Sequence, residues 1–483
     1  MKRFFFSFFL SIFLHTGYSE FNDSLFSYSC SKNSVVVQND NSIIKVEAWC
    51  DNIFRISWFP DMHNIVIDSS HSVILNQAPE VKFSVKEKHN ELIIKGRLIV
   101  AKITKIPFNI SFYKPDGSIL LQPAGAFECD GSSKKASFKI RKTDHFYGMG
   151  QKSIAVDRRG EAFEVFNQHI GGYTKPYGTM QINIPYIYST TGFGVYFDNQ
   201  YPARFDLGKT NPTEWYYKVE NGSFTYYLVA APNEESLLKS YFDLTGYPPL
   251  QPKWIYGLIQ SKCSYENDTM VYNTLQKFEE RKLPVDAIVL DIPWFGGLKP
   301  TSPHFMGNFS WNLQNFPDPI KYINTLRGKN VKTILINEPY INLDSYNYKF
   351  LKGKGWLVSK KNQSEPYVFS PFWAGDVSLF DITHPDAQKW LWQQLKAEVE
   401  FGADGLWSDL VEPESPVVDG QFYLGDWRKV HNIYSLLWAK NIYDGFSTDF
   451  PNKRITNLSR AGFGGIQRYG ALCWSGDASK TWF

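Results

Sequence analysis

The stretch Gly246-Tyr247-Pro248-Pro249-Leu250-Gln251-Pro252 divides this 483-residue chain into two parts with different hydrophobic patterns. Its three prolines leave little scope for a helix, which makes it the best candidate for a domain boundary. Before it, short apolar runs alternate with polar residues. After it, apolar stretches alternate with amphipathic segments of helical period. This change predicts a β domain followed by an α/β domain.

The part before the boundary has the period of two that is typical of strands with one buried face. Met180, Ile182 and Ile184 alternate with polar neighbours, and Phe193, Val195 and Phe197 do so after the turn at Thr191-Gly192. Many such runs, punctuated by Gly, Asn and Pro, indicate a β-sandwich. We therefore expect an N-terminal β-sandwich over residues 20–245.

The part after the boundary alternates strand candidates with helix candidates, which predicts βα units around a parallel sheet. Pro385, for example, suits the first turn of a helix that continues through Leu391, Leu395 and Val399. The six strand candidates are Ile255–Gln260, Ala287–Asp291, Thr333–Asn337, Gly405–Asp409, Arg454–Ser459 and Ala471–Trp474. An open doubly wound sheet and a (β/α)8-type barrel both fit this rhythm. No Gly-rich phosphate loop follows the first strand, which favours the barrel over residues 250–483.

Composition excludes several classes of protein. With 43% hydrophobic and 20% charged residues, the chain has ordinary globular usage and is neither disordered nor fibrous. Lys plus Arg number 51 against 48 Asp plus Glu, and no basic stripe stands out, so nucleic acid is not an expected partner. Phe, Tyr and Trp together make up 17%. Most of these rings belong to the core, although flat amphipathic rings also bind sugars.

The N-terminus has the features of a secretory signal over residues 1–19. Lys2 and Arg3 precede the apolar run 4–14, and Gly17 and Ser19 are small residues before a plausible cleavage point. The run is too short to span a bilayer, so no stable membrane insertion is expected after cleavage, and an uncleaved N-terminal anchor is the alternative. We therefore expect a secreted or periplasmic protein.

The five cysteines are widely spaced, at positions 30, 50, 129, 263 and 473. Cys30 and Cys50 are compatible with a disulfide, but nothing in the spacing requires one, and buried small hydrophobic thiols are the favoured interpretation. The chain has neither a CxxC nor an HExxH pattern. No metal site and no cofactor is therefore predicted.

Charged residues recur where the predicted barrel strands end, which is where catalytic groups of such barrels project. A solvated loop carboxylate or a helix cap would explain any one of them alone, but their shared place in the topology favours a joint role. They are Asp291, Glu338, Asp409 with Glu412 close by, Arg460 and Asp477, and Trp373, Trp407 and Trp474 lie near them in the sequence. Two carboxylates with complementary roles, beside indole rings, are the equipment of retaining glycoside cleavage.

Two motifs make the pattern more specific. The run Gly405-Leu406-Trp407-Ser408-Asp409-Leu410-Val411-Glu412-Pro413 resembles the nucleophile signature of glycoside hydrolase family 31. The run from Ser459-Arg460-Ala461-Gly462 through Gln467-Arg468 to Trp474-Ser475-Gly476-Asp477 resembles the acid/base segment of that family. Phe146-Tyr147-Gly148-Met149-Gly150, Asp157-Arg158-Arg159-Gly160 and Pro252-Lys253-Trp254 are similar to motifs nearer its N-terminus. The resemblance covers the chain from about residue 146 onward.

The resemblance implies a role for each matched residue. Asp409 would be the nucleophile, and Asp477 the general acid and then the general base. Asp291 and Arg460 would bind the sugar in the first subsite, with Glu412 beside them. Trp373, Trp407 and Trp474 would wall the pocket. The substrate implied is an α-glucan or malto-oligosaccharide.

Elementary electrostatics suggests how these roles would be supported. We expect Arg460 to lower the pKa of Asp409, and apolar contact with Trp474 to raise the pKa of Asp477. Retention requires the two carboxyl groups to lie roughly 5–5.5 Å apart.

The sequence departs from the family pattern at several positions. Val411 and Leu410 stand where Asn and Met are usual, and the second strand end lacks the second acid found in many hydrolytic members. With Asn337-Glu338-Pro339-Tyr340, these features resemble the bacterial 4-α-glucosyltransferase branch. Trp294, Phe295 and Tyr340 are either an acceptor platform or packing residues. Hydrolysis and transfer both remain open.

The chain length favours a second interpretation of the barrel. A (β/α)8 barrel of about 250 residues needs eight strands, and the sequence offers six candidates. Two βα units, together roughly 60 residues, are therefore unaccounted for. We expect a barrel that stops after about six βα units. A catalytically incompetent fragment or carbohydrate-binding remnant is therefore the alternative to an active enzyme, and a glycosidase of another barrel family is a third reading that the paired motifs disfavour.

Overall fold

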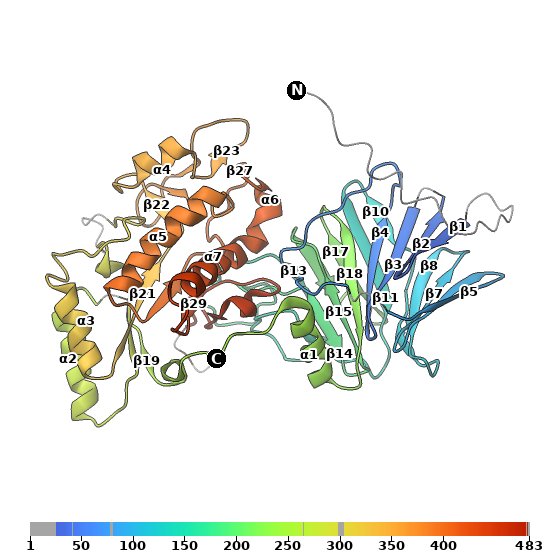
Figure 1. Cartoon of the computed structure of the whole chain (residues 1–483), viewed down its shortest axis with the longest axis horizontal. Coiled ribbons are helices and arrows are strands. Elements are labelled where there is room, and N and C mark those ends of the chain that lie inside the picture. Colours follow the sequence, from blue (N-terminus) through green and yellow to red (C-terminus); the bar gives the residue numbers. More distant parts are fainter. Residues whose placement is uncertain are drawn as a thin grey trace.

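The computed structural model describes residues 26–40, 42–77, 81–263, 265–297, 304–479 and 481. The expected signal segment, residues 1–19, lies outside these residues. Figure 1 shows a β-rich half built from the first part of the chain and a half with helices around a parallel sheet built from the second. The fold class predicted from the sequence, a β domain followed by an incomplete barrel, is confirmed.

Three antiparallel sheets build the β-rich half, and their facing apolar side chains form its core. The eight-stranded sheet has the order β1 (Phe26–Cys30), β2 (Ser34–Asn39), β3 (Ser42–Cys50), β4 (Ile53–Phe59), β18 (Phe224–Ala230), β15 (Phe193–Phe197), β14 (Tyr186–Ser189) and β12 (Phe146–Gly148). One five-stranded sheet has the order β10 (Glu128–Asp130), β11 (Ser133–Lys139), β17 (Glu214–Val219), β16 (Ala203–Asp206) and β13 (Ala162–Val165). The other runs through β5 (Ser84–Lys88), β6 (Glu91–Lys95), β7 (Val100–Thr104), β8 (Asn109–Tyr113) and β9 (Ile119–Leu121).

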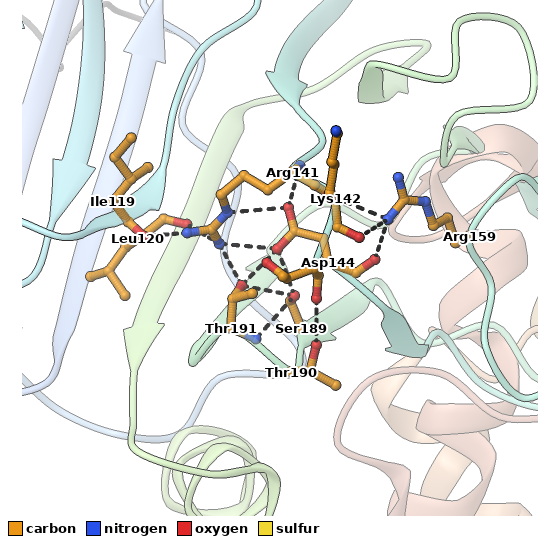
Figure 2. Close-up of polar contacts among 10 residues, drawn as sticks. Ile119, Leu120, Arg141, Lys142, Asp144, Arg159, Ser189, Thr190 and Thr191 are labelled. Carbon is orange, nitrogen blue, oxygen red and sulfur yellow. Dashed lines mark hydrogen bonds and ion pairs between the residues drawn. The ribbon is translucent and has the colours of Figure 1, made fainter.

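A buried carboxylate joins separate segments of this half (Figure 2). Asp144 is 1% exposed and accepts hydrogen bonds from the Arg141 guanidinium and from the hydroxyls of Ser189 and Thr191. Arg141 also donates to the carbonyl of Leu120 at 3.2 Å. The cluster therefore ties the segment before β12 to β9 and to the β14–β15 turn.

One strand expected in this half does not form. Residues 180–184 alternate in sequence, yet Gln181, Ile182 and Asn183 are all buried and only a single bridge, from Ile182 to Gly462, is present. The segment lies at the junction of the two halves and is covered on both sides. The alternating pattern was therefore misleading, because its polar positions are buried instead of facing solvent. The Asn183 side-chain amide donates to the carbonyl of Met180 at 2.7 Å.

The six strands of the parallel sheet follow chain order without reversal, and every neighbouring pair is parallel. A doubly wound sheet reverses its order at a switch point, whereas a barrel adds each unit beside the last. The order therefore decides in favour of the barrel. The strands are β19 (Ile259–Gln260), β20 (Ala287–Leu290), β21 (Lys332–Asn337), β26 (Gly405–Ser408), β29 (Asn457–Ser459) and β30 (Ala471–Leu472).

Helices connect these strands, and their sequence signals act as expected. Asn267 caps α2 (Asp268–Glu280) by accepting a hydrogen bond from the Met270 amide, and Pro385 occupies the first turn of α5 (Pro385–Phe401). The first predicted strand is corrected, because Lys253–Tyr256 forms a 3-10 turn and only Ile259–Gln260 pairs. The α-helices are α1 (Glu234–Thr245), α2 (Asp268–Glu280), α3 (Pro319–Gly328), α4 (Tyr348–Lys354), α5 (Pro385–Phe401), α6 (Trp427–Val430) and α7 (Tyr434–Asp449).

Two small antiparallel sheets are inserted between β21 and α6. One is formed by β22 (Tyr340–Asn342), β25 (Val377–Leu379) and β24 (Val368–Phe369). The other is formed by β23 (Ser359–Lys360), β27 (Gly420–Phe422) and β28 (Gly425–Asp426). Figure 1 shows β22, β23 and β27 on the side of the sheet where β21 ends.

A buried pair of amides locks the two halves together. The side-chain oxygen of Asn432 accepts from the Asn167 amide N–H at 3.0 Å, and the Asn167 side chain donates to the Asn432 carbonyl at 3.1 Å. Both residues are at most 1% exposed. Because a buried amide is costly to leave unpaired, these bonds fix the end of β13 against the turn before α7.

The cysteines do not match the sequence expectation. Cys30, Cys129, Cys263 and Cys473 are exposed, Cys50 is half-buried, and no disulfide joins Cys30 to Cys50. They are therefore not the buried hydrophobic thiols that their spacing suggested. None of the helices in the described ranges is both long and apolar enough to cross a membrane.

Candidate active site

The carboxyl ends of the parallel strands bring charged residues that are far apart in sequence to one place. Asp291 directly follows β20, Glu338 follows β21, Asp409 follows β26 and Arg460 follows β29. The Asp409 amide still continues the ladder, since it donates to the Asn337 carbonyl at 3.0 Å. The sheet register thus positions the Asp409 side chain at the strand end.

Arg460 is the centre of the charge network. Its side chain is 2% exposed, and its Nε lies 3.1 Å from Asp409 Oδ1. The same guanidinium binds Glu412 through two hydrogen bonds of 2.7 and 2.9 Å. Glu414 accepts a further bond from Nη2 at 2.6 Å. A single cation therefore faces three carboxylates.

Burial changes the protonation of Asp409 more than the arginine does. Burial raises its pKa from 3.8 to about 7, while Arg460 lowers it and the negative charges of Glu412 and Asp291 raise it again. Arg460 thus lowers the pKa of Asp409 as expected, but burial outweighs it and the net pKa is raised. Desolvation penalises the ionised form by more than one shared arginine recovers.

Two further carboxyl groups share this environment. Burial raises the pKa of Asp291 to about 6, and the Asp291 side chain accepts a hydrogen bond from the Ile292 amide at 2.7 Å. Burial and the charges of Asp409 and Asp291 hold the pKa of Glu338 well above its ordinary value. Glu338 is 4% exposed, and its Oε2 has no hydrogen-bond partner among the described residues. The site thus contains more carboxyl groups than cations, an arrangement that stabilises a positive charge developing on a bound molecule.

Asp477 lies at the rim of the site, in the segment after β30. Its side chain is 67% exposed, and its Oδ2 lies 3.4 Å from Nε2 of His169 in the β-rich half. It is close enough to Asp291 for its charge to raise the pKa of that carboxyl. The predicted separation of 5–5.5 Å between Asp409 and Asp477 stays a prediction.

Two of the three tryptophans expected to wall the pocket contact each other. Trp407, in β26, makes an edge-to-face contact with Trp474, with ring centroids 5.5 Å apart. Trp373 is 50% exposed, and its described ring contacts are with His304 and Phe372. Ring contacts thus pair Trp407 with Trp474, and a pocket wall shared with Trp373 stays a prediction.

Sequence reasoning did not single out two contributors to the site. Glu414 is only two residues beyond Glu412, so its charge was visible, but its bond with Arg460 depends on how the loop turns. The segment 166–173 of the β-rich half contacts the acid-bearing loop after β30. Nothing in the sequence marks a contact across about 300 residues. Among the described residues, no group of three or more Cys, His, Asp or Glu side chains is arranged to hold a metal ion.

Comparison with known proteins places this geometry in a family. Residues 248–483 match the TIM-barrel domain of glycosyl hydrolases family 31, and residues 43–206 match the N-terminal galactose mutarotase-like domain of glycosyl hydrolase 31. The chain belongs to glycoside hydrolase family 31. Its predicted membership, and its assignment to a family of glycosidases, are confirmed.

Relatives within family 31 act on different α-glycosides, as their names indicate. The chain is 28% identical over 478 residues to alpha-glucosidase 2 of Bacillus thermoamyloliquefaciens, which covers 95% of this chain and 58% of that protein. An alpha-glucosidase and an alpha-xylosidase of Saccharolobus solfataricus are 29% and 27% identical, over 70% and 71% of this chain and 52% and 45% of those proteins. The chain spans about half the length of these relatives.

Solved structures of the family have the same arrangement of domains. A family 31 dextranase of Flavobacterium johnsoniae, complexed with glucose, superposes with a TM-score of 0.88 at 26% identity, over 94% of this chain and 56% of that one. A family 31 alpha-xylosidase from a soil metagenome has a TM-score of 0.81 at 24% identity, over 93% and 68%. The second likeness supports the fold alone.

Proposed function

We propose that this protein is a retaining α-glucosyl enzyme that acts on α-glucans or malto-oligosaccharides. The observation that carries the proposal is the convergence of Asp409, Arg460 and Asp291 at the carboxyl ends of strands of one parallel sheet, with Asp477 at the rim. Names of relatives in the family favour α-glucosides, and α-xylosides are the second substrate class that those names suggest.

The proposed mechanism has two steps. Asp409 attacks the anomeric carbon while Asp477 gives its proton to the leaving oxygen, which forms a covalent glucosyl-aspartate. Water or another sugar then attacks the same carbon, and Asp477 takes the proton of the attacking hydroxyl. Two inversions retain the anomeric configuration.

The surroundings of Asp409 support this role. The acid-rich site around Arg460 stabilises the oxocarbenium-like charge that develops on the sugar. Asp409 must be ionised to attack, so the mechanism works best above its pKa of about 7 in the empty site. Asp291 and Arg460 are the proposed partners of the sugar hydroxyls, with Trp407 and Trp474 beside the ring.

Transfer to another oligosaccharide is a further part of the proposal. Trp294 and Tyr340 were possible acceptor residues, but both are fully buried: the Trp294 indole donates to the Ile336 carbonyl, and the Tyr340 hydroxyl accepts from the Ser415 amide. Their burial favours packing roles. Acceptor binding would therefore depend on exposed rings such as Trp373.

Incubation with maltotriose separates the possible activities. Glucose and maltose alone indicate hydrolysis, and products both longer and shorter than maltotriose indicate transfer. Asp409→Ala is expected to abolish either activity, and turnover that survives would refute the nucleophile. If maltotriose stays unchanged with the unmodified protein, the result would favour a carbohydrate-binding or inert chain.

We also propose, from the N-terminal sequence, that the protein is secreted or periplasmic, which cell fractionation tests.

A further inference from the structure

A loop of the β-rich half, residues 166–173, lies against the barrel on the side of the proposed acid. Its first residues are anchored by buried contacts. Phe166 stacks on His431 with ring centroids 3.9 Å apart, and Asn167 pairs with Asn432 as described above. The carbonyl of Asn167 also lies 2.6 Å from His431 Nε2. The first two residues of the loop are therefore held against His431 and Asn432 of the barrel.

The far end of the loop is anchored to the segment that carries Asp477. The Gly172 amide donates to the Asp477 carbonyl at 2.6 Å, and Ser479 Oγ donates to the Gly172 carbonyl at 2.7 Å. The Tyr173 hydroxyl donates to the Ser475 carbonyl at 3.1 Å. These bonds hold the acid-bearing segment by its backbone, with the loop fixed at both ends.

His169 lies between these two anchors. Its side chain is 17% exposed, with Nε2 3.4 Å from Asp477 Oδ2. Its Nδ1 is buried and has no hydrogen-bond partner among the described residues. A Cβ at Gly171 would come within 3.0 Å of Nε2, so the bare glycine lets the ring take this position. Since a carboxylate only accepts hydrogen bonds, the ring proton belongs on Nε2.

We propose that His169 is a positioning residue that orients the Asp477 carboxyl group for proton transfer. This inference rests on the proposed function. The Nε2–H of His169 donates to Oδ2, which leaves Oδ1 to carry the proton toward the leaving oxygen. In the first step that proton moves from Oδ1 to the leaving group, and in the second it returns from the attacking hydroxyl. His169 keeps its own proton throughout, and Asp291 is a further charged group near Asp477.

The role matters because Asp477 is mostly exposed. An exposed carboxylate samples several rotamers, and an exposed ion pair alone contributes little to stability. The benefit of His169 is therefore orientation, and it should be visible in the catalytic step that needs an acid. A purely structural histidine would affect all substrates alike.

The leaving group provides the test of this distinction. Fluoride departs from α-glucosyl fluoride without help from an acid, whereas the sugar leaving from maltotriose needs a proton. His169→Ala is expected to lower kcat for maltotriose by at least about tenfold and to change kcat for α-glucosyl fluoride far less. His169→Gln, which keeps an N–H donor, should restore much of the loss. Equal losses on both substrates, or none, would overturn the proposal.

A matched control and a readout independent of turnover complete the experiment. The control is His145→Ala, which removes a histidine from a different pair, in which His145 Nδ1 lies 2.6 Å from Asp157 Oδ2. The kcat values for maltotriose and for α-glucosyl fluoride should both stay unchanged in this variant. Nitrogen-15 spectra of histidine should show His169 locked as the Nε2–H tautomer in the unmodified protein and mixed in Asp477→Ala. Identical tautomers in both proteins would contradict the contact. A locked tautomer in a protein without turnover would instead refute the proposed function while the contact stands.

Discussion

Replacing the proposed nucleophile should stabilise the empty protein at alkaline pH. Burial raises the pKa of Asp409 from 3.8 to about 7, so the folded protein holds a proton there that the unfolded chain has lost. The stability from a raised carboxyl pKa is fully present below the unfolded value and is lost as pH rises through the folded value. The unmodified protein should therefore lose stability between about pH 4 and pH 8.

The size of the effect follows from the pKa. Each pKa unit corresponds to about 1.4 kcal/mol, so the ionised form of Asp409 costs up to about 4 kcal/mol relative to the protonated form. Asp409→Asn resembles the protonated form, and Arg460 keeps its bonds with Glu412 and Glu414. We expect the advantage of the variant over the unmodified protein to grow with pH, from up to about 2 kcal/mol at pH 5 to up to about 4 kcal/mol at pH 8.5.

The assay is the thermal unfolding midpoint of both proteins at pH 5 and pH 8.5, followed by tryptophan fluorescence. Asp376→Asn provides the control, because it makes the same substitution in an exposed residue where solvent screens the charge. A difference between Asp409→Asn and the unmodified protein that does not depend on pH would refute the reasoning.

Three further outcomes follow from the structure. The value of kcat/KM should fall about tenfold per pH unit below about pH 7, as Asp409 takes up a proton, and a profile that stays flat down to pH 5 would contradict this. Asp144→Ala should lower the free energy of unfolding by about 2–4 kcal/mol in urea denaturation, because Arg141 loses its buried partner, whereas an unchanged midpoint would show the cluster to be dispensable. Asn432→Leu should cost about 2–3 kcal/mol and expose the domain junction to protease, because Asn167 loses its partner, and equal digestion of both proteins would argue against that role.

Strand ends were predictable because the geometry of parallel sheets is strict. Once β20, β21 and β26 are recognised from their apolar runs, their carboxyl ends must meet at one edge, and their acids come together. The sequence was compatible with both an open doubly wound sheet and a barrel, because apolar runs reveal which segments are strands but not which strands lie side by side. The unreversed strand order in space resolved that choice.

Features that depend on burial and on distant contacts were not predictable. The neighbouring charges of Asp409 were visible in the sequence, but its desolvation is a property of the assembled site and reverses the expected direction of the pKa. The contact of His169 with Asp477 joins two domains, and no local pattern reports it. Residues 180–184 show a related error. Their alternating polar residues suggested a solvent-facing side, but Gln181 and Asn183 are buried because the segment is covered on both sides.

The central claim is that Asp409 forms a covalent bond with the sugar during turnover. A 5-fluoro-α-glucosyl fluoride slows the second step more than the first, so it should accumulate the glucosyl-enzyme. Mass spectrometry of peptides from the treated protein should then find the fluoroglucosyl group on Asp409, and none in Asp409→Asn. A label on another carboxylate, or an unlabelled protein that still cleaves maltotriose, would contradict the account.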